Sequence, residues 1–247
     1  MKVLADKIAI VTGGANGIGK ATATLFAQAG ATVIIWDMNE PKGKATEKEL
    51  QEQGYKVHFA KVNTSEWKDV EAAADAVVKE YGQIDILLNN AGITRDATLA
   101  KMEVEQWEQV IDVNLSGVFY CGKAVAPYMI KKGYGRIINT SSVVALYGNF
   151  GQSNYAAAKA GLIGMSKVWA RELGKKGITV NTVAPGFVQT DMMGTIPDKV
   201  MEGLLSRIPL ARLGTPNEIG QVYLFLASDN ASYINGATIC ADGGLTL

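Results

Sequence analysis

The chain has 247 residues, 48% of them hydrophobic, which suits one globular domain with a sizeable core. Its 24 lysines and arginines balance 24 aspartates and glutamates, so no net charge attracts nucleic acid or an anionic membrane. Two cysteines and one histidine, His58 in an expected strand, indicate neither a disulfide framework nor a metal site. With no apolar run near the ~20 residues that span a bilayer, we expect a cytoplasmic, single-domain protein covering residues 1–247.

Short apolar, β-branched runs alternate with segments of helical spacing along most of the chain. The expected strands are Ile8–Thr12, Thr32–Asp37, Val57–Val62, Ile84–Asn89, Arg136–Thr140, Ile178–Val183 and Thr238–Ala241. The expected helices are Ile18–Ala29, Lys42–Gln53, Glu66–Tyr81, Val104–Ile130, Tyr155–Gly174 and Asn217–Ser228. Nearly continuous hydrophobicity within the strands is typical of parallel strands that helices cover on both faces. The pattern predicts an α/β fold with a doubly wound sheet of seven parallel strands.

The segment from about 190 to 215 interrupts this alternation, because it carries Met, Leu, Pro and Gly without a strand. Ligands of such folds bind beyond the carboxyl ends of the strands, so the segment is predicted to be a substrate lid. Together with the stretches 92–96 and 209–214, its apolar side chains suggest an acyl chain more than a polyhydroxylated substrate; the alternative is that they only pack on the domain when the lid closes. They are Met192, Met193, Ile196, Leu204 and Leu205.

A glycine-rich turn joins the first expected strand to the first expected helix. Gly13, Gly17 and Gly19 permit a tight turn and a close approach of the backbone to a pyrophosphate, which the free N–H groups of the helix N-terminus would bind. Asn16 and Ile18 lie in the same turn and are predicted to contact the phosphates. The spacing differs from G-x-G-x-x-G, but the strand–turn–helix context is the required one.

Several polar and small residues follow other expected strands, at the same edge of the sheet. Asp37 stands 18 residues past Gly19, where a carboxylate can accept hydrogen bonds from an adenosine ribose; a solvated turn is the alternative. The remaining residues predicted to line the cofactor cleft are Asn63, Asn90, Ala91, Gly92, Pro185, Gly186, Val188 and Thr190.

Three further residues carry the expected chemistry. Tyr155 and Lys159 are four apart in an Ala-rich helical segment, so both side chains emerge on one helix face. An ammonium about 4 Å from the phenol supplies up to ~4 kcal/mol at an effective dielectric near 20, roughly what a phenolate near pH 7 requires. Ser142 follows an expected strand and can hydrogen-bond a substrate carbonyl. Asn114, polar among apolar neighbours, needs a partner or a water, and a buried structural amide is the equal alternative.

Taken together, these motifs resemble the short-chain dehydrogenase/reductase family over nearly the whole chain. The resemblance implies a Rossmann-type sheet, a homotetramer, and a catalytic tetrad of Asn114, Ser142, Tyr155 and Lys159. In that tetrad Tyr155 exchanges a proton with the substrate oxygen, Ser142 polarises the carbonyl, and Lys159 also contacts the nicotinamide ribose. Asn114 would anchor a water in the proton relay, and Thr190 would meet the nicotinamide amide.

Within the family, three stretches most resemble bacterial 3-oxoacyl-[acyl-carrier-protein] reductases and acetoacetyl-CoA reductases. They are 92–96, 142–164 and 209–214. This resemblance implies hydride transfer between the nicotinamide and a 3-oxoacyl or 3-hydroxyacyl thioester on an acyl carrier protein or CoA. Those enzymes usually use NADPH and lack the carboxylate of Asp37, so NAD is the expected cofactor here and NADP the alternative. They also carry an acidic residue at the position of Asn63.

A group of basic residues is a candidate surface for docking an acidic carrier protein, although lysines that flank turns are ordinarily only solvated. The group comprises Lys131, Lys132, Arg136, Lys175 and Lys176. Three other functions fit parts of the sequence. An NAD-dependent dehydrogenase of a sugar, polyol or cyclic alcohol would share the scaffold. Sugar-nucleotide epimerases share Tyr-x-x-x-Lys but resemble longer chains, and a non-enzymatic cofactor sensor would have a broken tetrad.

Overall fold

The computed structural model describes residues 2–190, 203 and 205–246, so half of the expected lid lies outside the described residues. In the described part, seven parallel strands form one sheet in the order β3-β2-β1-β4-β5-β6-β7. The strands are β1 Ile8–Thr12, β2 Thr32–Asp37, β3 Val57–Lys61, β4 Ile86–Asn89, β5 Gly135–Thr140, β6 Ile178–Pro185 and β7 Thr238–Ala241. The α-helices are α1 Gly17–Gln28, α2 Glu40–Glu52, α3 Trp67–Tyr81, α4 Val104–Ile111, α5 Gly117–Lys132, α6 Val144–Tyr147, α7 Ser153–Gly174 and α9 Pro216–Ala227.

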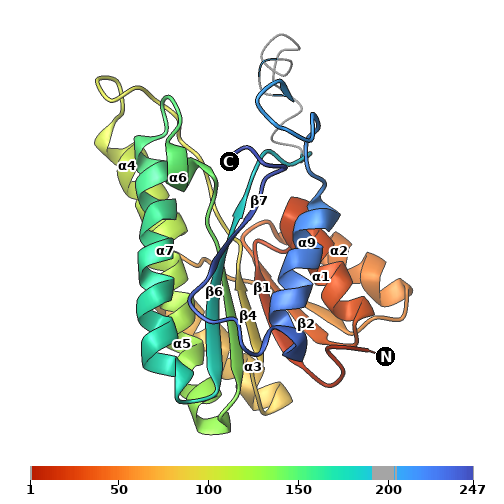
Figure 1. Ribbon diagram of the computed structural model, residues 1–247. Helices are drawn as coiled ribbons and strands as arrows, with labels where there is room; N and C mark the ends of the chain where they lie inside the picture. The colour runs from red at the N-terminus through yellow and green to blue at the C-terminus, as the bar shows by residue number, and fades with distance from the viewer. Residues whose placement is uncertain (1, 191–202, 204, 247) are drawn as a thin grey trace.

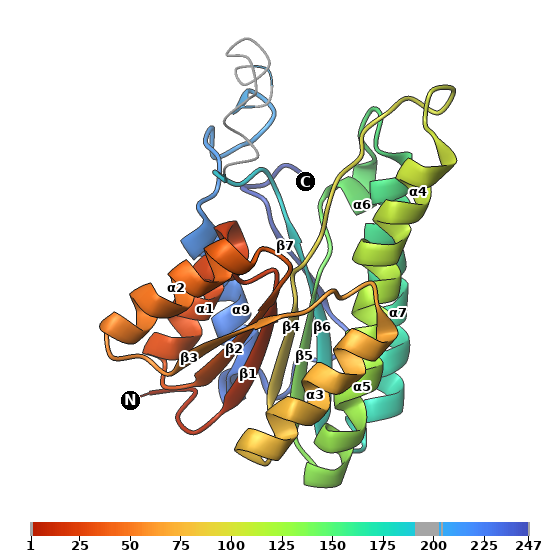
Figure 2. The ribbon, with the colours of Figure 1, turned by 180° about the vertical axis from the view of Figure 1, so that it is seen from behind.

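Helices cover both faces of the sheet, as Figures 1 and 2 show from opposite sides. Helices α1, α2 and α9 share one core with Ala9 and Val11 of β1, whereas α3, α5 and α7 share the other with Ile8 and Ile10. Successive side chains of a strand point to opposite faces, so one continuous apolar run supplies both cores. The predicted doubly wound α/β fold is confirmed. Among the described helices, none is long and apolar enough to cross a membrane.

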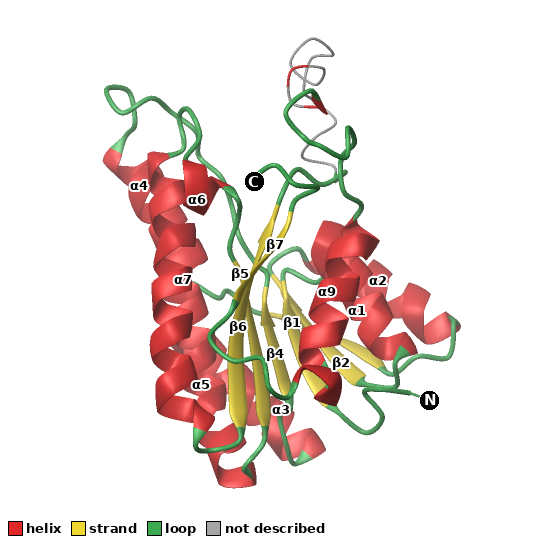
Figure 3. Cartoon of the chain, in the orientation of Figure 1, coloured by secondary structure: helices red, strands yellow, loops and turns green. Residues whose placement is uncertain are grey.

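The sequence order reverses between β1 and β4, which are adjacent in the sheet although β2 and β3 separate them in the chain. Open α/β sheets bind ligands at such a switch point, outside the carboxyl ends of the strands. In Figure 3 these ends lie toward the upper part of the sheet, below the loops that lead to α4 and α6. The glycine-rich turn after β1 and the segment after β4 meet there.

The expected unbroken helix from Val104 to Ile130 is wrong. Helix α4 ends at Ile111, a π-helical turn occupies Asp112–Ser116, and α5 begins at Gly117. A π-turn accommodates one extra residue within a helix and is often found at functional sites. Here it contains Asn114, whose side chain is bound to the backbone of another loop. The strand expected over Ile84–Asn89 begins two residues later, and the strand from Ile178 continues to Pro185.

A buried carboxylate ties together three elements at the opposite, amino-terminal edge of the sheet. Asp85 is fully buried just before β4, and its Oδ2 accepts hydrogen bonds from the Ile8 amide at 2.8 Å and from Gln83 Nε2 at 2.9 Å. Its Oδ1 accepts a hydrogen bond from Lys132 Nζ at the end of α5. The contacts join β1, β4 and α5, so this ion pair holds the base of the sheet.

We expect Asp85→Ala to lower the free energy of unfolding by about 2–4 kcal/mol, because it leaves the buried Ile8 N–H without an acceptor and removes the partner of Lys132. Lys132→Met should cost a similar amount, because it leaves the fully buried Asp85 carboxylate without its cation and with only the Ile8 amide and Gln83 as donors. Urea unfolding at fixed protein concentration, followed by circular dichroism, measures both. A loss below about 1 kcal/mol in both variants would show that this ion pair does not hold the base of the sheet.

Candidate active site

The glycine-rich turn is shaped by contacts within the protein itself. Gly13 and Gly17 have φ angles of +64° and +52°, in the left-handed region that favours glycine. A Cβ on Gly13 would lie 2.8 Å from the Cα of Ala91, and a Cβ on Gly19 would clash with the carbonyl of Gly13. The turn delivers the chain into α1, where Asn16 Oδ1 accepts a hydrogen bond from the Gly17 amide at 2.6 Å.

Two residues after β4 brace this turn. Asn90 Nδ2 donates to the carbonyls of Thr12 at 3.1 Å and Gly13 at 3.2 Å. The Thr12 hydroxyl accepts hydrogen bonds from the amides of Asn90 and Ala91, each at 3.0 Å. These four bonds cross the β1–β4 switch point and fix the backbone that the phosphates would approach.

The carboxylate at the end of β2 is held against the same turn. Asp37 Oδ2 accepts a hydrogen bond from the Ala15 amide at 3.1 Å, and Oδ1 accepts one from the Asn39 amide at 2.8 Å. The side chain remains partly exposed. After β3, Asn63 Oδ1 accepts hydrogen bonds from the amide and hydroxyl of Ser65, so it stabilises its own turn.

The segment after β6 forms the other side of the predicted cofactor cleft. A Cβ on Gly186 would lie 2.7 Å from the Cα of Asp242, so glycine is required where this segment meets the C-terminal tail. Val188 is buried and pairs with Gly214 in an isolated bridge. The Thr190 methyl lies 3.5 Å from the position that a Cβ on Gly17 would occupy, so the segment ends against the glycine-rich turn.

The residues expected to carry the chemistry converge at the carboxyl ends of β4, β5 and β6. Tyr155 and Lys159 emerge from the first turns of α7, and the Lys159 ammonium lies 5.6 Å from the centroid of the Tyr155 ring. Lys159 is 3% exposed and donates to the carbonyl of Thr140 at 2.7 Å. Ser142 is hydrogen-bonded to the Tyr155 hydroxyl.

Burial raises the pKa of Tyr155, the hydrogen bond with Ser142 lowers it, and the charge of Asp96 raises it further, with a net upward shift. Burial also lowers the pKa of Lys159 to about 8. The phenolate expected from the Tyr155–Lys159 spacing is therefore not the form that these residues favour. The ammonium is directed at the Thr140 carbonyl, and removal from water penalises the charged form of both groups. The phenol stays protonated at neutral pH.

Asn114 is fully buried, and both ends of its amide bind the backbone of one residue. Its Oδ1 accepts from the Ile93 amide at 2.8 Å, and its Nδ2 donates to the Ile93 carbonyl at 2.9 Å. A Cβ on Gly92 would lie 3.3 Å from Asn114 Oδ1 and 3.5 Å from Lys159 Nζ, so the three residues meet. Asn114 is therefore a buried amide that positions this loop, and its expected role in anchoring a water of the proton relay stays a prediction.

Sequence reasoning missed two residues that position α7. The Ser141 hydroxyl donates to the carbonyl of Lys159 at 2.7 Å and ties the helix to the end of β5. Asn154 Nδ2 donates to the carbonyls of Arg95 and Gln106, while its Oδ1 accepts from the Tyr155 amide. Their partners are 18 to 59 residues away in the chain, apart from Tyr155, so the only local signal was a polar residue beside each predicted catalytic one.

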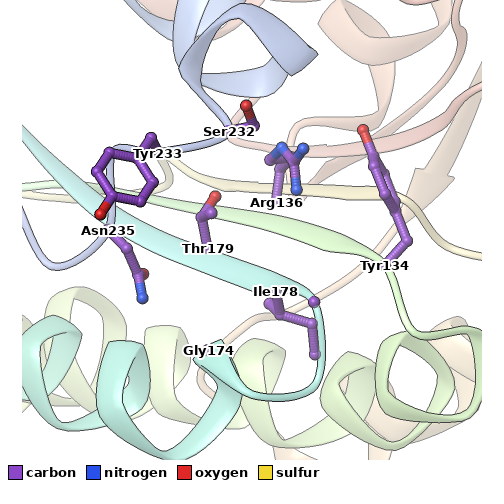
Figure 4. A pocket seen from close by; sticks show the side chains of 9 residues that line it. Tyr134, Arg136, Gly174, Ile178, Thr179, Ser232, Tyr233 and Asn235 are labelled. Carbon is purple, nitrogen blue, oxygen red and sulfur yellow. The ribbon is translucent and has the colours of Figure 1, made fainter.

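The structure removes Arg136 from the predicted basic docking surface but leaves Lys131, Lys175 and Lys176 exposed, so docking of a carrier protein there stays a prediction. Arg136 is 5% exposed and paired with Asp229 at 2.9 Å, and Lys132 is bound to Asp85. These residues lie at the amino ends of the strands, opposite the edge that carries Ser142. A cavity of about 440 Å³ lies there, away from the chemistry (Figure 4). It is lined by Tyr134, Arg136, Gly174, Gly177, Ile178, Thr179, Ser232, Tyr233 and Asn235.

Comparison with known proteins shows the family. A family model described as enoyl-(acyl carrier protein) reductase matches residues 13–246. A 3-oxoacyl-[acyl-carrier-protein] reductase FabG from Thermotoga maritima is 52% identical over 99% of both chains, and one from Chlamydia muridarum is 48% identical over 98% of both. The crystal structure of gox2181 superposes with a TM-score of 0.96 at 34% identity, covering 99% of this chain and 98% of that one.

The chain belongs to the short-chain dehydrogenase/reductase family, which confirms the resemblance predicted from its motifs. It is accordingly an oxidoreductase that acts on a CH–OH group with a nicotinamide cofactor. The residues present fit such a group: a glycine-rich turn at a helix N-terminus could bind its phosphates, and a carboxylate follows β2.

We expect Asn90→Ala and the isosteric Asn90→Asp each to raise the Kd for nicotinamide cofactor about tenfold. Both remove the donor that holds Thr12 and Gly13, so the turn must be ordered during binding. Quenching of intrinsic fluorescence by added cofactor measures the Kd. The control is Asn230→Ala, which removes an exposed amide near the amino-terminal edge of the sheet. Unchanged affinity in both Asn90 variants would show that the brace is dispensable.

Proposed function

We propose that this enzyme transfers a hydride between a nicotinamide cofactor and C3 of a 3-oxoacyl or 3-hydroxyacyl thioester. The convergence of Ser142, Tyr155 and Lys159 beside the glycine-rich turn carries the proposal, because it sets a proton donor next to the cofactor site. The names of the relatives that cover the whole chain support the thioester over the sugar, polyol or cyclic alcohol.

Each residue of the tetrad has a role in this reaction. When bound, the nicotinamide cofactor would supply the hydride for C3, and the carbonyl π electrons of the substrate would move onto its oxygen. Tyr155 donates its hydroxyl proton to that oxygen, and Ser142 donates a hydrogen bond that holds the carbonyl in place. The raised pKa of Tyr155 keeps the proton on the phenol until the substrate oxygen becomes basic. Lys159 provides the adjacent cation, and Asn114 positions the Gly92–Ile93 loop.

The surface beside the tetrad supports an acyl substrate. Leu146 and Phe150 lie between Ser142 and Tyr155 in the chain, and both are exposed, Phe150 by 86%. Exposed aromatic and aliphatic side chains next to a reacting centre favour an apolar ligand. Met192, Met193, Ile196 and Leu204, which led to the same expectation, lie outside the described residues. We keep the lid and the homotetramer as proposals.

We expect the enzyme to reduce acetoacetyl-CoA with NADH, monitored at 340 nm. Tyr155→Phe should lower kcat by at least a thousandfold with cofactor affinity nearly unchanged, because only the proton donor is lost. Lys159→Ala should weaken both turnover and cofactor binding. Turnover of polyols but not of acetoacetyl-CoA would refute the thioester assignment, and reduction of crotonyl-CoA alone would indicate an enoyl reductase.

The preference for NAD over NADP rests on the charge of Asp37. NADPH carries a phosphate of charge near −2 on the adenosine ribose, where this carboxylate is proposed to accept hydrogen bonds from NADH. Each like-charge pair at about 4 Å costs roughly 4 kcal/mol at an effective dielectric near 20, before screening. Lys44, a nearby cation that could offset the repulsion, is bound to Glu40 at 2.6 Å.

We therefore expect kcat/KM for NADH to exceed that for NADPH by at least tenfold. Asp37→Ser should narrow the gap chiefly by improving NADPH, since it removes the repulsion and keeps a hydrogen-bonding group. Steady-state kinetics with both cofactors at fixed ionic strength measures the ratio. Equal use of both by the unmodified enzyme would mean that Asp37 does not face the ribose.

A further inference from the structure

An arginine and a tyrosine from distant parts of the chain meet beside the predicted substrate site. The Arg207 guanidinium lies 5.7 Å from the centroid of the Tyr147 ring. Tyr147 ends α6, five residues after Ser142, whereas Arg207 belongs to the segment that precedes α9. That distance is within the ~6 Å over which a cation and an aromatic ring attract each other.

The chain around Arg207 is anchored by its neighbours. Ile208 is buried, and the Leu210 amide donates to the Gly243 carbonyl at 3.2 Å. The Ala211 amide donates to the Ile208 carbonyl at 2.7 Å and closes the turn. The C-terminal tail therefore fixes the backbone from which the guanidinium projects, so Arg207 is exposed on an ordered base.

The guanidinium is also available for an anion. The segment 205–215 contains two arginines, and Arg212 is bound by the carboxylate of Glu218. Within the described residues no carboxylate lies within 4.0 Å of the Arg207 nitrogens. Burial raises the pKa of Tyr147, the charge of Arg207 lowers it and the charge of Asp242 raises it. The Asp242 oxygens accept hydrogen bonds from the Gly244 amide and from Thr246.

We propose that Arg207, held against Tyr147, binds the phosphate of the pantetheine arm that carries the acyl thioester. An arginine fork can bind a phosphate through two hydrogen bonds. This inference rests on the proposed function, because only a thioester on CoA or a carrier protein brings such a phosphate. Arg207 would then recognise the carrier arm of the substrate, whereas other residues recognise the acyl group.

The dimensions agree with this assignment. About sixteen bonds separate C3, whose carbonyl Ser142 would hold, from the pantetheine phosphorus, and at ~1.2 Å per bond of an extended chain they span up to roughly 19 Å. The five residues from Ser142 to Tyr147 span at most ~17 Å if extended, and less here because 144–147 is helical. A substrate with its carbonyl at Ser142 can therefore place its phosphate at Arg207.

The test compares Arg207→Gln with Arg171→Gln, a matched change at an exposed arginine in the last turn of α7. At low ionic strength we expect Arg207→Gln to raise KM for acetoacetyl-CoA about fivefold with kcat unchanged. KM for the acetoacetyl thioester of N-acetylcysteamine, which has no phosphate, should stay the same. Inhibition by free CoA should weaken by the same factor, and Arg171→Gln should change none of these values.

Acetoacetyl carrier protein distinguishes the source of the phosphate. A matching rise in its KM supports recognition of the arm common to both carriers, whereas a rise for the CoA ester alone supports binding of the phosphates of CoA. An unchanged KM for acetoacetyl-CoA, or an equal rise for the N-acetylcysteamine ester, would overturn the assignment. Failure of the proposed function is separate, because the unmodified enzyme would then reduce none of the three thioesters.

Discussion

Two hydrogen bonds between α7 and the end of β5 determine the geometry of the residues predicted to be catalytic. The Lys159 ammonium donates a hydrogen bond to the Thr140 carbonyl, and the Ser141 hydroxyl donates one to the Lys159 carbonyl, both at 2.7 Å. Because all three groups are buried, breaking either bond would strand a polar group away from water. The helix is thereby fixed in register with the strand that presents Ser142. A shift of one residue along α7 would turn Tyr155 by about 100° away from it.

Hydrogen bonds between elements also fix the backbone on the side of the predicted cofactor site. The four bonds among Thr12, Gly13, Asn90 and Ala91 join the ends of β1 and β4, which are neighbours only because the chain order reverses there. The packing of Gly13 on Ala91 requires glycine whether or not a phosphate is present. A glycine-rich motif thus reflects two constraints, the approach of a ligand and the closure of the switch point. That explains why its spacing can depart from G-x-G-x-x-G while the fold stays the same.

The sheet, the order of the helices and the edge that carries the site could be predicted from the sequence. Continuous apolar strands, helical spacing and glycine-rich breaks are local signals. The predictions that failed concerned residues whose contacts lie far away in the chain. The π-turn contains Asn114, whose side chain is hydrogen-bonded to Ile93, 21 residues away in the chain. Arg136 looked like a surface cation because its partner Asp229 is 93 residues away. The lowered pKa of Lys159 likewise follows from burial under the completed fold, which a four-residue spacing does not reveal.

The Asp37 carboxylate is held in a fixed position, and this rigidity bears on the proposed preference for NADH over NADPH. A flexible carboxylate could swing away from an added phosphate and leave little discrimination. Here the amides of Ala15 and Asn39 each hold one carboxylate oxygen, and Ala15 belongs to the turn that would bind the pyrophosphate. Moving the carboxylate would therefore cost hydrogen bonds in the turn itself. If Asp37 faces the ribose as proposed, the charge opposes the extra phosphate of NADPH from a fixed position, and the protein cannot relax that repulsion without loosening its own phosphate-binding turn.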